Sequence, residues 1–148
     1  MIQLKKPLTI LMADDDEDDR LMTKEALIEA KQLNEFRTVE DGEELMEYLK
    51  RSGRYSSPNS APTPGLILLD LNMPKKDGRE VLKEIKTNPV FRRIPIVVLT
   101  TSKADDDIAR TYELGVNSFV VKPATFEQLV EVMKMLTKYW FNVVELPQ

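Results

Sequence analysis

The sequence contains no histidine and no cysteine among its 148 residues. The absence of histidine excludes Ser-His-Asp catalysis, zinc sites built on imidazole, and a phosphohistidine carried by the chain itself. Without cysteine there is no disulfide and no thiolate chemistry, a composition that suits a reducing cytoplasm. Any chemistry at this chain must therefore use carboxylates, hydroxyl groups, lysine or arginine.

Long apolar runs are also missing. No stretch approaches the roughly 20 residues of a membrane span, and residues 1–10 lack the apolar core and cleavage site of a signal peptide. We therefore expect a cytoplasmic protein that does not contact a membrane. The formal net charge is −4 and basic residues form no long run, so nucleic-acid binding is not expected. The length suits one domain over residues 1–148, with an apolar C-terminal tail at 139–148.

Short apolar runs alternate with helical patterns along the chain. Nearly continuous apolar runs predict strands at residues 8–13, 66–69, 95–99 and 118–121, and weak alternation predicts an outer strand at 35–40. Helical spacing of apolar residues predicts helices at 18–33, 45–49, 81–85, 104–114 and 126–140. Residues 52–64 are rich in serine and proline and predict an exposed, mobile loop. Alternation of this kind predicts an α/β fold, a parallel sheet with helices on both faces.

A polar residue follows or ends each buried run. Asp14 and Asp15 follow the first run, Asp70 the run at 66–69, Thr100 the run at 95–99, and Lys122 the run at 118–121. The carboxyl ends of parallel strands meet at one edge of the sheet, where ligands bind in open α/β folds. Each residue alone could be an ordinary turn or helix-cap residue. Their convergence at one edge favours a functional site.

The chemistry of these groups points to phosphoryl transfer. Three carboxylates at one edge repel each other unless a cation joins them or one stays protonated, and their oxygen atoms suit Mg²⁺. The carboxylate of Asp70 could accept a phosphoryl group as an acyl phosphate. Lys122 and the hydroxyl of Thr100 could then neutralise and position the phosphoryl oxygens, which is the main requirement of this reaction.

Four segments resemble the receiver domains of bacterial response regulators in two-component signalling. They are Asp14-Asp15, LLDLNMPKKDG at 68–78, LTTS at 99–102 and FVVKP at 119–123. The resemblance covers nearly the whole chain in order and spacing. It implies a flavodoxin-like (βα)5 fold with strand order 2-1-3-4-5. It also implies that Asp70 accepts a phosphoryl group from a sensor histidine kinase and that the message passes on through protein contacts.

The same resemblance assigns a metal site. It implies that Asp15 and Asp70 bind Mg²⁺ directly, together with the backbone carbonyl of Asn72, and that Asp14 binds it through water. It further implies that Lys122 contacts the phosphoryl group.

Two more features follow from the resemblance. Thr100 and Phe119 would form the switch pair that reports phosphorylation, and the Lys122–Pro123 peptide bond would be cis. Thr101 departs from many receivers, in which a smaller residue follows the switch threonine, and its bulk could alter the lifetime of the phosphoryl group.

Within this family the chain is most similar to small single-domain regulators of bacterial and cyanobacterial phytochrome kinases. The likeness rests on the Ser/Pro-rich segment before the third strand and on the tail YWFNVVELP at 139–147. It implies a phytochrome as the partner kinase. It also favours a homodimer through the face of the fourth helix, fifth strand and fifth helix.

Two other functions compete with this interpretation. Phosphatases of the haloacid dehalogenase type also use an aspartyl phosphate, but they place a second Asp two residues after the nucleophile, where this chain has Asn72. A non-catalytic scaffold receiver would normally have lost Asp70 or Lys122, and both are present. We therefore expect a phosphoacceptor with at most slow self-catalysed dephosphorylation, and not an enzyme.

Overall fold

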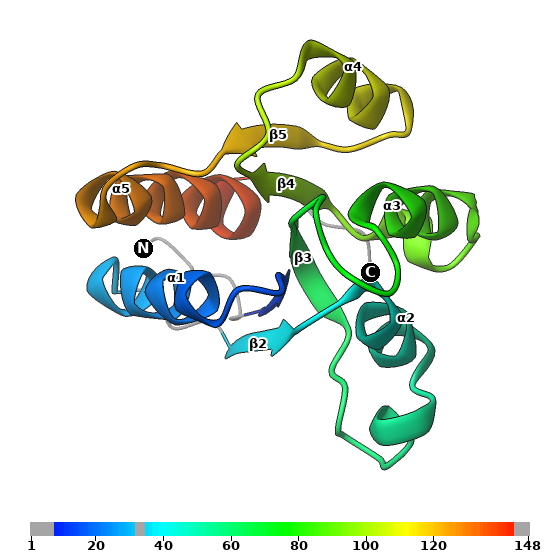
Figure 1. Ribbon diagram of the computed structural model, residues 1–148. Coiled ribbons are helices and arrows are strands. Elements are labelled where there is room, and N and C mark those ends of the chain that lie inside the picture. The colour runs from blue at the N-terminus through cyan, green and yellow to red at the C-terminus, as the bar shows by residue number, and fades with distance from the viewer. Residues whose placement is uncertain (1–7, 32–34, 144–148) are drawn as a thin grey trace.

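The computed structural model describes residues 8–31 and 35–143, without the side chains of 141–143. Its centre is a five-stranded parallel sheet in the order β2-β1-β3-β4-β5 (Figure 1). The strands are β1 (Thr9–Ala13), β2 (Glu35–Val39), β3 (Pro64–Leu69), β4 (Ile96–Thr100) and β5 (Ser118–Val121). The fold class and strand order expected from the sequence are confirmed.

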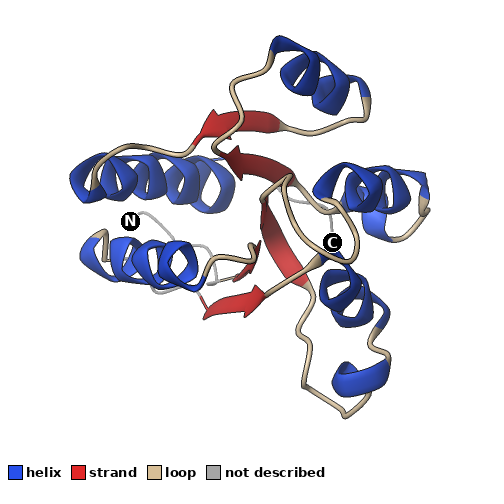
Figure 2. Ribbon diagram, viewed as in Figure 1, coloured by secondary structure: helices blue, strands red, loops and turns tan. Residues whose placement is uncertain are grey.

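Helices cover both faces of the sheet (Figures 1 and 2). They are α1 (Glu17–Glu29), α2 (Gly42–Lys50), α3 (Gly78–Thr87), α4 (Asp105–Glu113) and α5 (Phe126–Thr137), with short turns η1 (Gly53–Tyr55), η2 (Phe91–Arg93) and η3 (Lys138–Val143). The predicted end of the first helix at Leu33 lies outside the described residues. Among those described, no helix combines the length and apolar character needed to span a membrane.

Two apolar clusters join these layers. Ile10 and Met12 of β1 pack with residues of α1 and α5, whereas Leu11 and Ala13 pack with residues of α2 and α3. This alternation is the two-residue period of a strand with both faces buried. The strand ends therefore sit on a rigid core.

Helix α4 is the least anchored of the five helices. Its one buried residue is Thr111, and its first turn consists of three aspartates, Asp105 to Asp107. Acidic side chains at a helix N-terminus are favoured by the helix dipole. Such side chains add no apolar packing against the sheet, so the position of α4 depends more on polar contacts than that of its neighbours.

The last α-helix is shorter than the predicted range 126–140. The α-helix stops at Thr137 and the chain continues as a π turn, with Trp140 partly buried against the cluster of α1 and α5. The side chains of Phe141 and Val143, and all of Val144 and Leu146, lie outside the described residues. The dimer expected from this tail therefore stays a prediction.

The segment between α2 and β3 is more ordered than the predicted mobile loop. It contains the turn η1, and Ala61 is buried. The hydroxyl of Tyr48 donates to the carbonyl of Pro62 at 2.7 Å, and Nε of Arg51 donates to the carbonyl of Ala61 at 3.1 Å. Hydrogen bonds to backbone carbonyls leave no apolar period in a sequence, so the pattern could not reveal this anchoring.

We expect Tyr48→Phe to loosen this segment without changing the sheet. Removing the hydroxyl leaves the Pro62 carbonyl without this donor, which should lower the free energy of unfolding by about 1 kcal/mol. Urea denaturation measures the loss, and limited proteolysis should cut the mutant faster between residues 52 and 63. Tyr139→Phe, at an exposed tyrosine, is the control. Equal behaviour of the two variants would contradict the anchoring role.

Candidate functional site

The predicted polar residues meet at the carboxyl edge of the sheet. The backbone N–H of Asp14 donates to Val39 and that of Asp70 to Ala13, so both residues extend the strand pairing by one step. The hydroxyl of Thr100 donates to Oδ1 of Asp70 at 2.8 Å. The strand framework therefore delivers these side chains to one point.

Lys122 supplies the positive charge at this point. Its Nζ lies 2.8 Å from Oδ2 of Asp14 and 3.1 Å from Oδ2 of Asp70. Burial alone would lower the pKa of Lys122, but its hydrogen bonds to Asp14 and Asp19 and the charges around it raise that pKa above its usual range. Lys122 is therefore a permanent cation between the carboxylates.

Asp14 is the most deeply buried of these acids. Burial raises its pKa from 3.8 to about 6, although Lys122 and the backbone N–H of Asp16 favour the ionised form. Its Oδ2 has Lys122 as ion-pair partner but, among the described residues, no hydrogen bond of good geometry. Asp14 thus has one poorly satisfied carboxylate oxygen, an arrangement that favours a nearby cation.

Three carboxylates form a donor set for a divalent ion. Asp14, Asp15 and Asp70 each offer a carboxylate oxygen, and these oxygens lie within 4.8 Å of one another. Asp15 is exposed while the other two are buried, so the group opens to solvent on one side. An all-oxygen set with a solvent-facing side suits a hard cation that keeps some of its water. The residues fit Mg²⁺ or a similar ion.

The remaining predicted site residues lie around this group. Asn72 is exposed, and its N–H is 3.3 Å from Oδ1 of Asp70. Phe119 is partly buried against the cluster of α2 and α3, and its N–H donates to the hydroxyl of Tyr112 on α4. Phe119 therefore touches both the core and the least anchored helix.

The expected cis bond before Pro123 is wrong. No cis peptide occurs among the described residues, so the Lys122–Pro123 bond is trans. Trans is the more stable isomer of an X-Pro bond by about 0.5–1 kcal/mol, so a Lys-Pro pair does not by itself specify cis.

Sequence reasoning missed one residue at the site, Asp19 on the first turn of α1. Its Oδ2 lies 2.6 Å from Nζ of Lys122. In the sequence it is one of six consecutive acids, residues 14 to 19, that precede or begin a helix. Only the packing of α1 against α5, which begins shortly after Lys122, distinguishes it from its neighbours.

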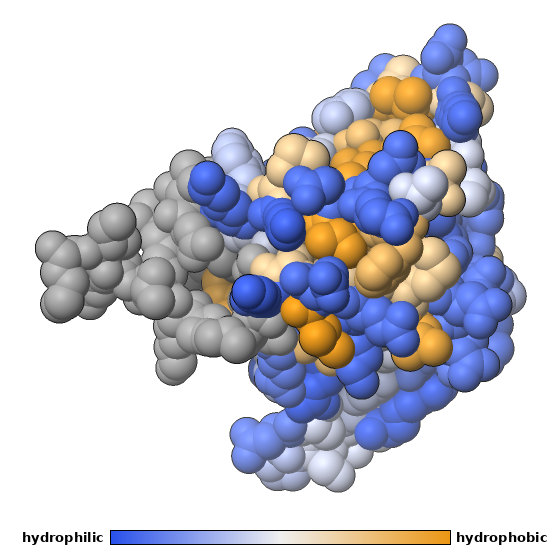
Figure 3. Space-filling model, turned by 90° about the vertical axis from the view of Figure 1, so that its left-hand side faces the viewer, coloured by the Kyte–Doolittle hydropathy of each residue, from blue (hydrophilic) through white to orange (hydrophobic). Residues whose placement is uncertain are grey.

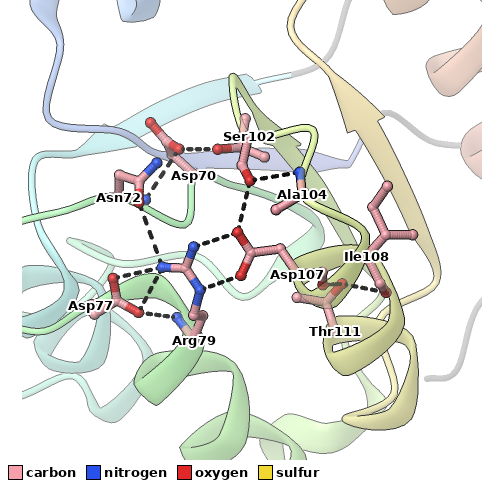
Figure 4. Close-up of polar contacts among 10 residues, drawn as sticks. Asp70, Asn72, Asp77, Arg79, Ser102, Ala104, Asp107, Ile108 and Thr111 are labelled. Atoms are coloured by element: carbon pink, nitrogen blue, oxygen red, sulfur yellow. Dashed lines mark hydrogen bonds and ion pairs between the residues drawn. The ribbon is translucent and has the colours of Figure 1, made fainter.

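A second missed feature links the site to α4 through Arg79 (Figure 4). The guanidinium of Arg79, on α3, makes two hydrogen bonds of 2.7 Å to the two carboxylate oxygens of Asp107 on α4. It also contacts Asp77 at 3.1 Å and reaches the side chain of Asn72 at 3.5 Å. Ser102, two residues after Thr100, donates to Asp107 at 2.7 Å. We call Arg79, Asp107 and Ser102 the polar clamp.

The polar clamp compensates for the weak apolar anchoring of α4. A paired guanidinium and carboxylate form a strong, directional contact, which fixes both the position and the angle of the helix. The hydrogen bonds from Arg79 and Ser102 lower the pKa of Asp107 from 3.8 to about 2. No period or motif marks Arg79 in the sequence, since the contact spans 28 residues.

The polar clamp predicts a pH-dependent stability. Because the pKa of Asp107 is lower in the folded state, its stabilisation is full above pH 3.8 and is lost as the pH falls toward 2. Asp107→Asn should lower the free energy of unfolding at pH 7 by about 1–2 kcal/mol. The difference in the free energy of unfolding between wild type and variant, measured by urea denaturation, should shrink below pH 3.8. Asp106→Asn, in the same helix turn but exposed, is the control. A difference that does not change with pH would contradict the assignment.

Comparisons with known proteins agree with this geometry. The family described as response regulator receiver domain matches residues 10–134. Response regulator Rcp1 of Synechocystis sp. is 42% identical over 141 residues, which cover 95% of this chain and 94% of Rcp1. The probable methanogenesis regulatory protein FilR2 of Methanothrix harundinacea is 34% identical over 96% of this chain and 89% of its own length.

Solved structures extend the comparison to three dimensions. The structure of phosphorylated RcpA, a cyanobacterial phytochrome response regulator, has a TM-score of 0.88 at 43% identity and covers 97% of this chain and 100% of its own. The Mn²⁺-bound form of Rcp1 gives a TM-score of 0.86 at 42% identity, over 96% and 100%. The chain therefore belongs to the response regulator receiver domain family of two-component signalling, and it is similar to response regulator Rcp1 and to the phytochrome response regulator RcpA.

Proposed function

We propose that the chain accepts a phosphoryl group from a sensor histidine kinase on Asp70. The observation that carries this proposal is the position of the Asp70 carboxylate between the Thr100 hydroxyl at 2.8 Å and the Lys122 ammonium at 3.1 Å. A group transferred to this carboxylate would meet a hydroxyl donor and a cation without rearrangement of the sheet. The exposed neighbours Asp15 and Asn72 leave the site open to a partner.

The transfer balances with the groups available. An oxygen of Asp70 attacks the phosphorus of the kinase phosphohistidine, the P–O bond forms, and the P–N bond breaks with its electron pair returning to the imidazole. Lys122 and the hydroxyl of Thr100 then exchange contacts with Asp70 for contacts with phosphoryl oxygens. Neutralisation and positioning of these oxygens are what phosphoryl transfer chiefly requires.

A divalent ion belongs to the proposal. Asp14, Asp15 and Asp70, with the backbone carbonyl of Asn72, would hold Mg²⁺, with Asp14 acting through water. When bound, the ion would offset the negative charge of the phosphoryl oxygens. The poorly satisfied Oδ2 of Asp14 supports a cation in this place.

The phosphoacceptor role is favoured over phosphatase or scaffold functions. A phosphatase of the haloacid dehalogenase type needs an acid two residues after its nucleophile, and the amide of Asn72 cannot transfer a proton. A scaffold receiver would not need Asp70 and Lys122 in contact. The chain would therefore act as a signalling protein with at most slow self-catalysed dephosphorylation.

The signal would leave the site through Thr100 and Phe119. If Thr100 moves toward the phosphoryl group, it releases space that Phe119 can occupy, and phosphorylation shifts the balance between two states. Phe119 is joined to α4 through its hydrogen bond to Tyr112. Output then follows from a change at α4.

The likeness to Rcp1 and RcpA supports a phytochrome as the partner kinase, a single receiver unit along residues 1–148, and a cytoplasmic location. The downstream partner would be a protein and not nucleic acid, because the net charge is −4.

Replacing the acceptor tests this function. Asp70→Asn should remain folded but lose incorporation of phosphate from acetyl phosphate or a phosphorylated kinase by at least about 100-fold. Phos-tag electrophoresis and mass spectrometry measure the product, and circular dichroism checks the fold. Excess chelator should stop labelling of the wild-type chain. Undiminished labelling of the variant at another residue would contradict the assignment.

We further propose a homodimer through the face of α4, β5 and α5. The strand β5 is at the edge of the sheet and all four of its residues are partly exposed, while Tyr112 on α4 and Met135 on α5 are exposed. On the side of the molecule that carries α1 and α5, apolar side chains gather in the middle of a mainly hydrophilic surface (Figure 3). Twofold pairing would cover such surface with an identical patch.

Sedimentation tests the dimer. Met135→Glu should weaken self-association by about tenfold or more, because it places a charge in the apolar contact. Val90→Glu, at an exposed apolar residue before β4 and outside this face, should have no effect. Removal of residues 141–148 should also shift the mass toward monomer. A wild-type chain that sediments as a monomer at all concentrations, with and without a phosphate mimic, would rule out the dimer.

A further inference from the structure

The ammonium group of Lys122 has three carboxylate partners. Its Nζ lies 2.6 Å from Asp19, 2.8 Å from Asp14 and 3.1 Å from Asp70. Lys122 donates hydrogen bonds to Asp19 and Asp70, whereas Asp14 is an ion-pair partner. Asp70 and Asp14 belong to the proposed acceptor and metal sites. Asp19, the nearest of the three, has no part in either.

The contact between Asp19 and Lys122 is held by the fold. The backbone N–H of Asp19 is 3.3 Å from the side chain of Asp16, which caps α1, and its carbonyl accepts from the hydroxyl of Thr23 at 2.9 Å. The Lys122 side chain is only 14% exposed and that of Asp19 33%. The two residues are 103 positions apart. This is an ion pair between a fixed helix turn and the end of β5, partly shielded from solvent.

We propose that Asp19 is a positioning residue that competes with the phosphoryl group for Lys122 and so limits how readily Asp70 is phosphorylated. The inference rests on the proposed phosphoacceptor function. Asp19 keeps Lys122 directed toward the start of α1, and its carboxylate offsets the positive charge that an incoming anion would meet.

The competition acts on binding of the phosphoryl donor more than on the chemical step. A phosphoryl donor brings negative charge into the site, so a nearby carboxylate opposes its binding. In the bound donor and in the transition state of transfer the negative charge lies on the same phosphoryl oxygens, so Asp19 opposes both to a similar extent. Removing Asp19 should therefore change the affinity for the donor and leave the rate constant of the chemical step almost unchanged.

A charge-matched pair of variants tests the inference. Asp19→Asn removes the carboxylate from Lys122, whereas Asp18→Asn removes the same charge from the same helix turn at an exposed position without a contact to Lys122. Phosphorylation of the full chain by acetyl phosphate in saturating MgCl₂ gives KM and the maximal rate. Titration with beryllofluoride, followed by NMR of Thr100, gives the affinity for a phosphoryl mimic without turnover.

For Asp19→Asn we expect KM for acetyl phosphate to fall, and the affinity for beryllofluoride to rise, by about three- to tenfold relative to Asp18→Asn. The maximal rate should change by less than about twofold. Equal values in the two variants, or a loss of phosphorylation in Asp19→Asn alone, would overturn the competition while leaving Asp70 as acceptor. Absence of label on Asp70 in the wild-type chain would instead overturn the proposed function together with this inference.

Discussion

The ion pairs of Lys122 hold the functional end of this molecule together. A parallel sheet brings the ends of β1 and β3 side by side and with them the carboxylates of Asp14 and Asp70, which repel each other. Lys122 lies between them at 2.8 and 3.1 Å and lets both remain buried. A buried charge is tolerated only when it is paired. The site is therefore a balance of charges in which any new anion must displace an existing partner.

Two kinds of interaction hold the elements of the structure in place. The sheet, α1, α2, α3 and α5 are joined by apolar packing, which is non-directional and difficult to reverse locally. Helix α4 is joined mainly by the polar clamp of Arg79, Asp107 and Ser102. Such contacts depend on geometry and charge, so they respond to small changes nearby. Helix α4, which would carry the output, is thus held by contacts that a charge at Asp70 can influence.

Ser102 connects the phosphoacceptor site to α4. Ser102 follows Thr100 by two residues and binds Asp107, while Arg79 reaches the side chain of Asn72, two residues after Asp70 (Figure 4). The loops after β3 and β4 therefore both lead from the acceptor to the clamp. In the proposed function, a shift of Thr100 would be transmitted to α4 over one short segment, without deformation of the core.

The sequence by itself determined the fold class, the order of elements and the convergence of four polar residues at one edge of the sheet. Strands buried on both faces are nearly continuous apolar runs, and the parallel topology then places Asp14, Asp70, Thr100 and Lys122 at one edge. These are consequences of local pattern and strand direction. The sequence could not decide which of several acids near the start of α1 pairs with Lys122, that Arg79 clamps Asp107, or that the Lys122–Pro123 bond is trans. Those features depend on distances between side chains that are far apart in the chain, and only the packing of the helices on the sheet sets these distances.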